Sequence, residues 1–135
     1  MKKTITSFLL AAMLFVGFSA FSQNSNSSFL ASTSNPVTTL VENEGVKVSY
    51  MQGFISSSQA FSFIFENTIH VAANFSWTLK DKQGNVVYTS PLIRLEEGQS
   101  ISENSNPKFA NVKFSFIPDN GTTINDYRVE LTFKQ

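Results

Sequence analysis

Residues 71–80 read Val-Ala-Ala-Asn-Phe-Ser-Trp-Thr-Leu-Lys, and apolar and polar side chains alternate along them almost without interruption. Successive side chains of a β-strand point to opposite faces, so this alternation is typical of a strand with one buried face and one solvated face. The stretch therefore predicts a strand that directs Phe75, Trp77 and Leu79 into a hydrophobic core.

The same period of two recurs on both sides of this stretch, and no segment after residue 22 keeps the 3.6-residue apolar period of a helix. The pattern predicts strands near residues 37–42, 45–52, 59–67, 70–80, 85–90, 92–95, 99–103, 108–117 and 124–134. Two facing sheets can bury the many phenylalanines of these segments, whereas one sheet could not. We therefore expect an all-β fold, an antiparallel β-sandwich of seven to nine strands with almost no helix.

The N-terminus has the composition of a secretory signal peptide. Two lysines precede an apolar run at residues 8–18, and small residues follow that run. The run is shorter than the roughly twenty residues that a membrane-spanning helix needs. We expect a signal peptide over residues 1–22 that is cleaved after Ser22 or, alternatively, after Ala20.

Two further segments follow the expected signal peptide. Residues 23–35 form a polar tract rich in Ser and Asn, with one apolar interruption at Phe29 and Leu30. This composition is typical of a flexible leader. Pro36 ends the tract, and residues 36–135 are expected to form the sandwich domain.

The sequence contains no cysteine. A lipid anchor on cysteine, a disulfide, a thiolate metal site and a cysteine nucleophile are therefore excluded. A small exported domain without disulfides is more typical of bacteria than of eukaryotes, and about 113 residues after cleavage can build a sufficient core. No second apolar run of membrane length follows, so we expect a mature chain that does not span the membrane and resides in the periplasm or outside the cell.

The charge balance argues against two classes of partner. Cleavage after Ser22 would remove Lys2 and Lys3 and no acidic residue, which leaves eight basic and ten acidic side chains. The remaining lysines are scattered, whereas nucleic-acid binding requires clustered Lys and Arg that neutralise several phosphates. We therefore expect no nucleic-acid partner and no binding to an anionic membrane surface.

Catalytic residues are scarce. His70 is the only histidine, so a site with several histidine ligands cannot form, and no Gly-x-Ser-x-Gly motif presents a nucleophile. The adjacent Glu96 and Glu97 lie in a glycine-containing turn, where a solvated position is a simpler interpretation than an acid–base pair. We expect a protein that is not an enzyme and that uses no cofactor.

Two loops remain as candidate sites. Met51 to Ser58 is a Gly/Ser-rich stretch that carries the apolar pair Phe54 and Ile55, which we interpret as a loop lid over the end of the sandwich or as an interaction loop. Asp119 and Asp126 flank a loop rich in oxygen ligands, but the spacing of an EF-hand is absent. Whether these two carboxylates form a weak calcium site stays open.

Three segments carry a resemblance to a known family. They are Phe-Ile-Phe-Glu-Asn-Thr at 63–68, Asn-Phe-Ser-Trp-Thr-Leu-Lys-Asp-Lys-Gln-Gly-Asn-Val-Val-Tyr at 74–88, and Leu-Glu-Glu-Gly-Gln-Ser-Ile at 95–101. In this order they resemble bacterial immunoglobulin-like domains of small secreted or periplasmic proteins. The resemblance implies the sandwich fold, with Trp77 as the core tryptophan. It carries no function with it.

These observations lead to a main functional hypothesis and two alternatives. The main hypothesis is an exported, non-catalytic module that binds another protein or an envelope component. The first alternative is a structural or assembly component of the cell envelope, in which an exposed edge strand pairs with another chain. The second alternative is a domain that inhibits a protease by inserting a loop.

Overall fold

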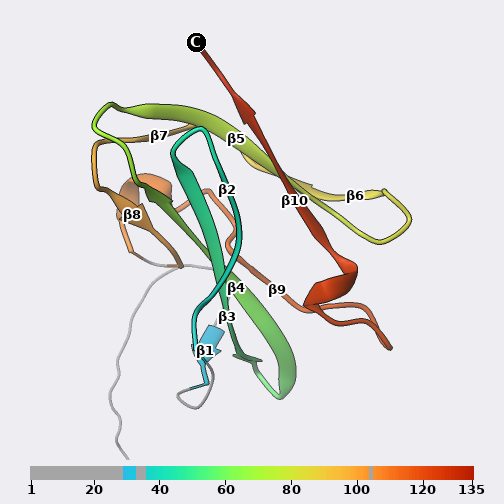
Figure 1. Cartoon of the computed structure of the whole chain (residues 1–135). Coiled ribbons are helices and arrows are strands. Elements are labelled where there is room, and N and C mark those ends of the chain that lie inside the picture. The colour runs from blue at the N-terminus through green and yellow to red at the C-terminus, as the bar shows by residue number, and fades with distance from the viewer. Residues whose placement is uncertain (1–28, 33–35, 104) are drawn as a thin grey trace, which may run out of the picture.

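The computed structural model describes residues 29–32, 36–103 and 105–135, which fold into two antiparallel sheets (Figure 1). The six-stranded sheet contains β1 (Phe29–Ala31), β2 (Thr38–Asn43), β3 (Val46–Ile55), β4 (Ser58–Asn67), β8 (Ser100–Ile101) and β9 (Ser115–Phe116). The four-stranded sheet contains β5 (Ala73–Lys80), β6 (Val86–Thr89), β7 (Ile93–Leu95) and β10 (Arg128–Phe133). The described residues form no α-helix, and the predicted all-β fold with two antiparallel sheets is confirmed.

Each sheet is built around its longest strands. β3 and β4, each of ten residues, form a hairpin at the centre of the first sheet, where β2 and β1 pair with successive parts of β3. On the other side, β8 and β9 pair with separate parts of β4. In the second sheet, β5 pairs with β10 along one edge and with β6 and β7 along the other.

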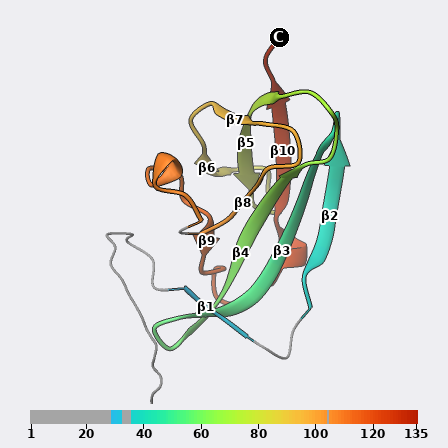
Figure 2. The ribbon, with the colours of Figure 1, turned by 90° about the vertical axis from the view of Figure 1, so that its left-hand side faces the viewer.

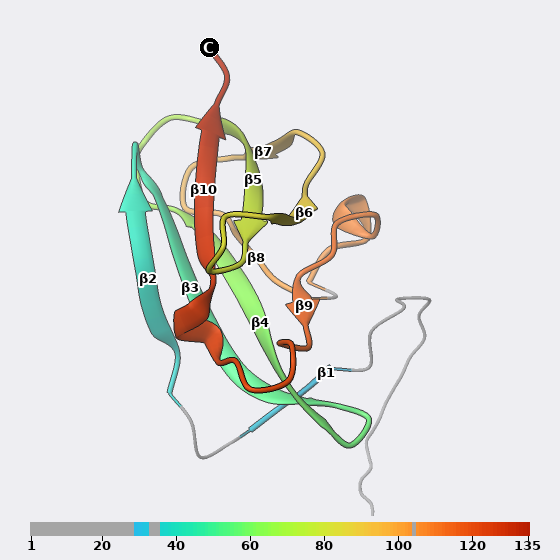
Figure 3. The same ribbon diagram turned by 90° about the vertical axis from the view of Figure 1, so that its right-hand side faces the viewer.

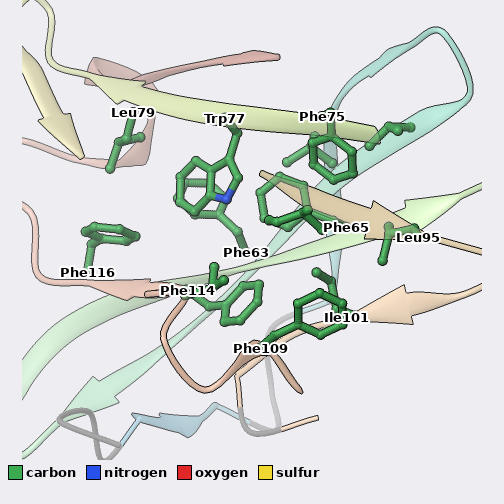
Figure 4. Close-up of a cluster of buried hydrophobic side chains, with 14 of the residues drawn as sticks. Phe63, Phe65, Phe75, Trp77, Leu79, Leu95, Ile101, Phe109, Phe114 and Phe116 are labelled. Atoms are coloured by element: carbon green, nitrogen blue, oxygen red, sulfur yellow. The ribbon is translucent and has the colours of Figure 1, made fainter. Parts of the chain in front are cut away.

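The core lies between the sheets and is largely aromatic (Figure 4). Trp77 is fully buried, and its ring centroid lies 5.3 Å from that of Phe63 and 5.0 Å from that of Phe65. Centroid separations of 4.5–7 Å are those at which aromatic pairs attract beyond simple burial. The indole Nε1 of Trp77 makes no hydrogen bond to any described residue. The alternation at 71–80 therefore predicted the buried face of β5 correctly.

The prediction of a strand over residues 108–117 is wrong for most of its length. Pro107–Phe109 forms a 3₁₀ helix (η3), because Pro107 fits the first helical turn and the Asn106 side chain accepts a hydrogen bond from the backbone of Lys108. Only Ser115–Phe116 is a strand. Phe114 is nevertheless buried, and its carbonyl accepts a hydrogen bond from the backbone N–H of Phe63. The alternation thus marked burial on an irregular segment.

A second 3₁₀ helix, η4 (Ile124–Asp126), replaces the beginning of the strand predicted at 124–134. The Thr123 side chain accepts a hydrogen bond from the backbone of Asn125, and the Asp126 carboxylate accepts one from the backbone N–H of Thr123. This capping box favours a helical turn over an extended backbone. β10 therefore begins at Arg128.

Asn67 ties two connections together at the end of β4. Its side chain is 1% exposed and donates through Nδ2 to the carbonyls of Val71, Leu95 and Glu96, at 2.8, 3.1 and 3.2 Å. Its Oδ1 accepts from the backbone N–H of Ile69 at 3.1 Å. One side chain thus satisfies groups from the β4–β5 and β7–β8 connections, which cross between the sheets.

The expected signal peptide, residues 1–22, lies outside the described residues, and so do residues 23–28 of the expected leader. Within the described part of the chain, no helix is long and apolar enough to cross a bilayer.

Candidate functional site

Phe54 and Ile55 do not lie in a loop. β3 continues to Ile55, and the chain returns through the two-residue turn of Ser56 and Ser57 into β4, so the prediction of a loop at 51–58 is wrong. Ser56 adopts a φ of 55°, a left-handed conformation that two-residue hairpin turns use. The predicted residues therefore form the end of the β3–β4 hairpin.

Part of the expected flexible leader is a strand across this hairpin end (Figure 2). In β1, Phe29 pairs with Ile55, Leu30 with Phe54 and Ala31 with Gly53. A Cβ on Gly53 would lie 2.1 Å from the Leu30 carbonyl oxygen and 2.8 Å from the Phe29 ring. Glycine is therefore required at position 53 for β1 to dock this closely.

β1 and β2 are two parts of one interrupted edge. Seven positions separate Ala31 from Thr38, but only three separate their partners on β3, Gly53 and Tyr50, so the pairing is interrupted between the two strands. Both strands run antiparallel to β3 along the same edge. The sequence signal for β1 was the apolar pair Phe29-Leu30 inside a polar tract.

A pocket of about 140 Å³ lies beside the hairpin end. Its apolar lining comes from Phe54, Phe61, Pro118 and Ile124, and its polar side chains are Ser32, Gln52, Gln59, Thr122 and Thr123. None of the lining side chains carries a charge. Phe54 is 43% exposed and its cross-strand neighbour Leu30 is 69% exposed, so an apolar surface continues from the pocket mouth.

Tyr127 connects two segments that line this pocket, Phe61 of β4 (the floor) and the turn at residues 118–122 (the wall). Its ring centroid lies 5.7 Å from that of Phe61, and its hydroxyl accepts a hydrogen bond from the backbone N–H of Asp119 at 2.9 Å. The backbone N–H of Thr122 donates to the Asp119 carbonyl, which closes the turn at residues 118–122. Tertiary contacts thus hold the wall in place. Because Phe61 is distant in sequence from Asp119 and Tyr127, the sequence alone could not show that they lie together.

The open question of a calcium site at Asp119 and Asp126 receives little support from the geometry. The Asp126 carboxylate is engaged by the Thr123 backbone in the capping box. In the described ranges, no group of three or more His, Cys, Asp or Glu side chains could hold a metal ion. The Asp126 carboxylate thus serves the local backbone.

His70 and the paired glutamates lie at the opposite end of β4 from the pocket. His70 Nδ1 is 2.7 Å from Glu97 Oε2, and the His70 side chain is 94% exposed. Glu96 Oε2 accepts a hydrogen bond from Arg94 Nε at 2.7 Å. Both pairs are solvated, as expected for a turn.

Two carboxylates have shifted pKa values, and neither belongs to the pocket. Hydrogen bonds from the backbone and side chain of Asn85 lower the pKa of Asp81 in the β5–β6 turn. Hydrogen bonds from Lys80 and Arg128 lower the pKa of Glu130 on β10. These carboxylates stay ionised, which suits a structural role in a turn and in an ion-pair cluster.

No protein-family model, curated protein or solved structure matches this chain. The pocket and its apolar rim are therefore the features on which a functional proposal rests.

Proposed function

We propose that this protein is an exported, non-catalytic binding module that holds an uncharged group of a partner protein in the pocket at the hairpin end. The observation that carries the proposal is the lining of the pocket, which combines apolar rings with uncharged hydrogen-bonding side chains. Binding sites are commonly concave and largely apolar, with a few polar groups that fix orientation.

Two features favour binding over catalysis. No lining residue can act as a general acid or base at neutral pH, because the pocket contains no His, Asp, Glu or Lys. The wall and floor are also held in place by Tyr127, so the pocket is formed before a partner arrives. Phe54 at the mouth is an aromatic residue of the type that anchors protein interfaces.

Export to the periplasm or the exterior is part of this proposal and rests on the sequence of residues 1–22. An immunoglobulin-like relationship is the finer proposal for the fold. It is supported by the central position of Trp77 and by the hydrogen bond that the Tyr127 hydroxyl accepts from the backbone N–H of Asp119, which resembles a tyrosine corner. The direct β3–β4 hairpin within one sheet departs from the usual strand order of that fold.

The test compares two aspartate substitutions of exposed apolar residues. Phe54→Asp puts a charge at the mouth of the pocket, while Val86→Asp changes a residue of β6 that is 59% exposed and far from it. The tagged mature proteins are incubated with envelope extract, and captured partners are quantified by mass spectrometry after both variants are shown to be folded. We expect a partner that Phe54→Asp loses and Val86→Asp retains. Equal capture by the two variants would rule out the pocket as the binding site.

A further inference from the structure

β10 has a free edge that faces away from β5. Lys134 donates its backbone N–H to the Asn74 carbonyl, which fixes the alternation of hydrogen bonds along this antiparallel pair. By that alternation, the N–H and C=O groups of Val129, Leu131 and Phe133 point outward. They make no hydrogen bond to any described residue. An unpaired row of this kind is a template for strand addition.

The other described edges are interrupted, whereas β10 is regular. The pairing of β2 with β3 shifts between Thr39 and Val41, and that of β6 with β5 shifts between Leu79 and Lys80. The remaining edge strands, β1, β7, β8 and β9, contain only two or three residues. β10 pairs with β5 over six residues without a shift. Bulges and short strands protect edges against pairing, so β10 is the least protected edge.

The position beside β10 lies over an uncovered part of the facing sheet. Figure 3 shows β2 extending past β10 on this side. The β2 residues that face the second sheet are those paired with the core-facing Tyr50, Val48 and Val46 of β3, and two of them, Thr38 and Asn43, are exposed. The second sheet therefore stops one strand short of covering β2. A single strand fits at this position, above β2. The β10 of a second copy does not fit equally well, because that copy would bring its own β2 into the layer that β2 already occupies.

The outer face of this edge is positively charged. Lys80, Arg128 and Lys134 lie on it, together with Glu130, whose carboxylate bonds to both Lys80 and Arg128. Lys134 is exposed and makes no ion pair with a described residue. Acidic side chains on an incoming strand would be attracted to this face.

We propose that the β10 edge, meaning the outward backbone of Val129, Leu131 and Phe133, accepts one extended strand of a partner protein that runs antiparallel to β10, with apolar residues facing β2 and acidic residues facing outward. Strand addition of this kind takes its affinity from backbone hydrogen bonds and its specificity from alternate side chains. The surface is separate from the pocket, so either proposal can fail without the other.

The probe is a blocked six-residue peptide in which Glu and Val alternate. In an antiparallel pairing with β10, Val side chains that face β2 belong to residues whose N–H groups face β10, because the two residues of a hydrogen-bonded pair lie directly opposite and share one face of the sheet. One control peptide is N-methylated at its Val residues and loses the donors toward β10. A matched control is N-methylated at its Glu residues and keeps those donors. Binding to residues 23–135 is followed by NMR through the amides of Val129, Leu131 and Phe133.

We expect the unmodified and Glu-methylated peptides to shift and protect these three amides, and the Val-methylated peptide to bind at least about tenfold more weakly. Thr38→Asp, on the face of β2 that lies toward the second sheet, is expected to weaken binding, while Val86→Asp on β6 leaves it unchanged. Equal binding of the two methylated peptides, or no shift at these amides, would overturn the proposal. A dimer that protects the same amides without peptide would also overturn it, because a second copy would then occupy the edge.

Discussion

Replacing Asn67 tests the view that one buried amide holds the two sheet crossings together. Asn67→Ala removes the amide donor from the carbonyls of Val71, Leu95 and Glu96 and the acceptor from the N–H of Ile69. The Leu95 carbonyl keeps the Ala73 N–H, because these two residues form a hydrogen-bonded pair of β5 and β7. Each of the four lost hydrogen bonds costs about 0.5–1.5 kcal/mol. We expect a loss of about 2–4 kcal/mol in the free energy of unfolding, because the contributions do not add in full.

Asn67→Asp adds a pH dependence of predictable sign. The substitution keeps the Oδ1 acceptor but places a carboxylate oxygen beside three carbonyl oxygens, so the pKa of the introduced carboxyl rises in the folded state. The unfolded chain keeps a pKa of about 3.9. The destabilisation relative to the unsubstituted chain therefore grows as the pH rises above about 3.9, and it is complete above the folded pKa.

Urea unfolding followed by Trp77 fluorescence measures both effects, since Trp77 is the single tryptophan and is fully buried. The matched controls are Asn74→Ala and Asn74→Asp, because the half-buried Asn74 side chain makes no hydrogen bond to a described residue. Measurements at pH 4 and pH 7 give the pH dependence. A loss below about 1 kcal/mol for Asn67→Ala, or the same loss for Asn67→Asp at both pH values, would refute the role assigned to Asn67.

Three further predictions concern other parts of the chain. Gly53→Ala should release β1, since the added Cβ would collide with the Leu30 carbonyl, and hydrogen exchange should become faster at residues 29–31 while β5 stays protected. Protection unchanged at 29–31 would contradict this. NMR titration of Asp81 should give a pKa below the ordinary value, and the stabilisation it provides should be lost as the pH falls through that lowered pKa; Asn85→Ala should raise that pKa. The exported protein should begin at Gln23, which N-terminal sequencing of the protein from the envelope fraction would show. A protein that still begins at Met1 would disprove cleavage.

Strict alternation proved a sufficient guide to regular strands. It located β3, β4 and β5 within a few residues because their side chains divide cleanly between core and solvent. It failed at 108–117, where Val112 and Phe114 are buried from an irregular backbone. Alternation reports which side chains are buried. It does not report whether the backbone is hydrogen-bonded to a neighbouring strand.

The candidate site was only partly accessible from sequence. Phe54 was predicted as an interaction residue, and it lies at the mouth of the pocket, although on a strand. Gln59 and Thr122 line the same pocket from segments more than sixty residues apart. A local sequence pattern cannot predict that residues so far apart in the chain lie side by side. β1 was missed because its three residues are too few for a period to emerge.

The connectivity of β4 has a consequence for how the protein is made. One side of β4 is completed early by its hairpin partner β3, while the other side must wait for β8 and β9. The edge of β5 is completed last, by β10. Contacts between distant segments slow folding and leave apolar surface exposed meanwhile. During synthesis the second edge of β4 thus stays unpaired until β8 and β9 have emerged, a period in which a chaperone would find its target.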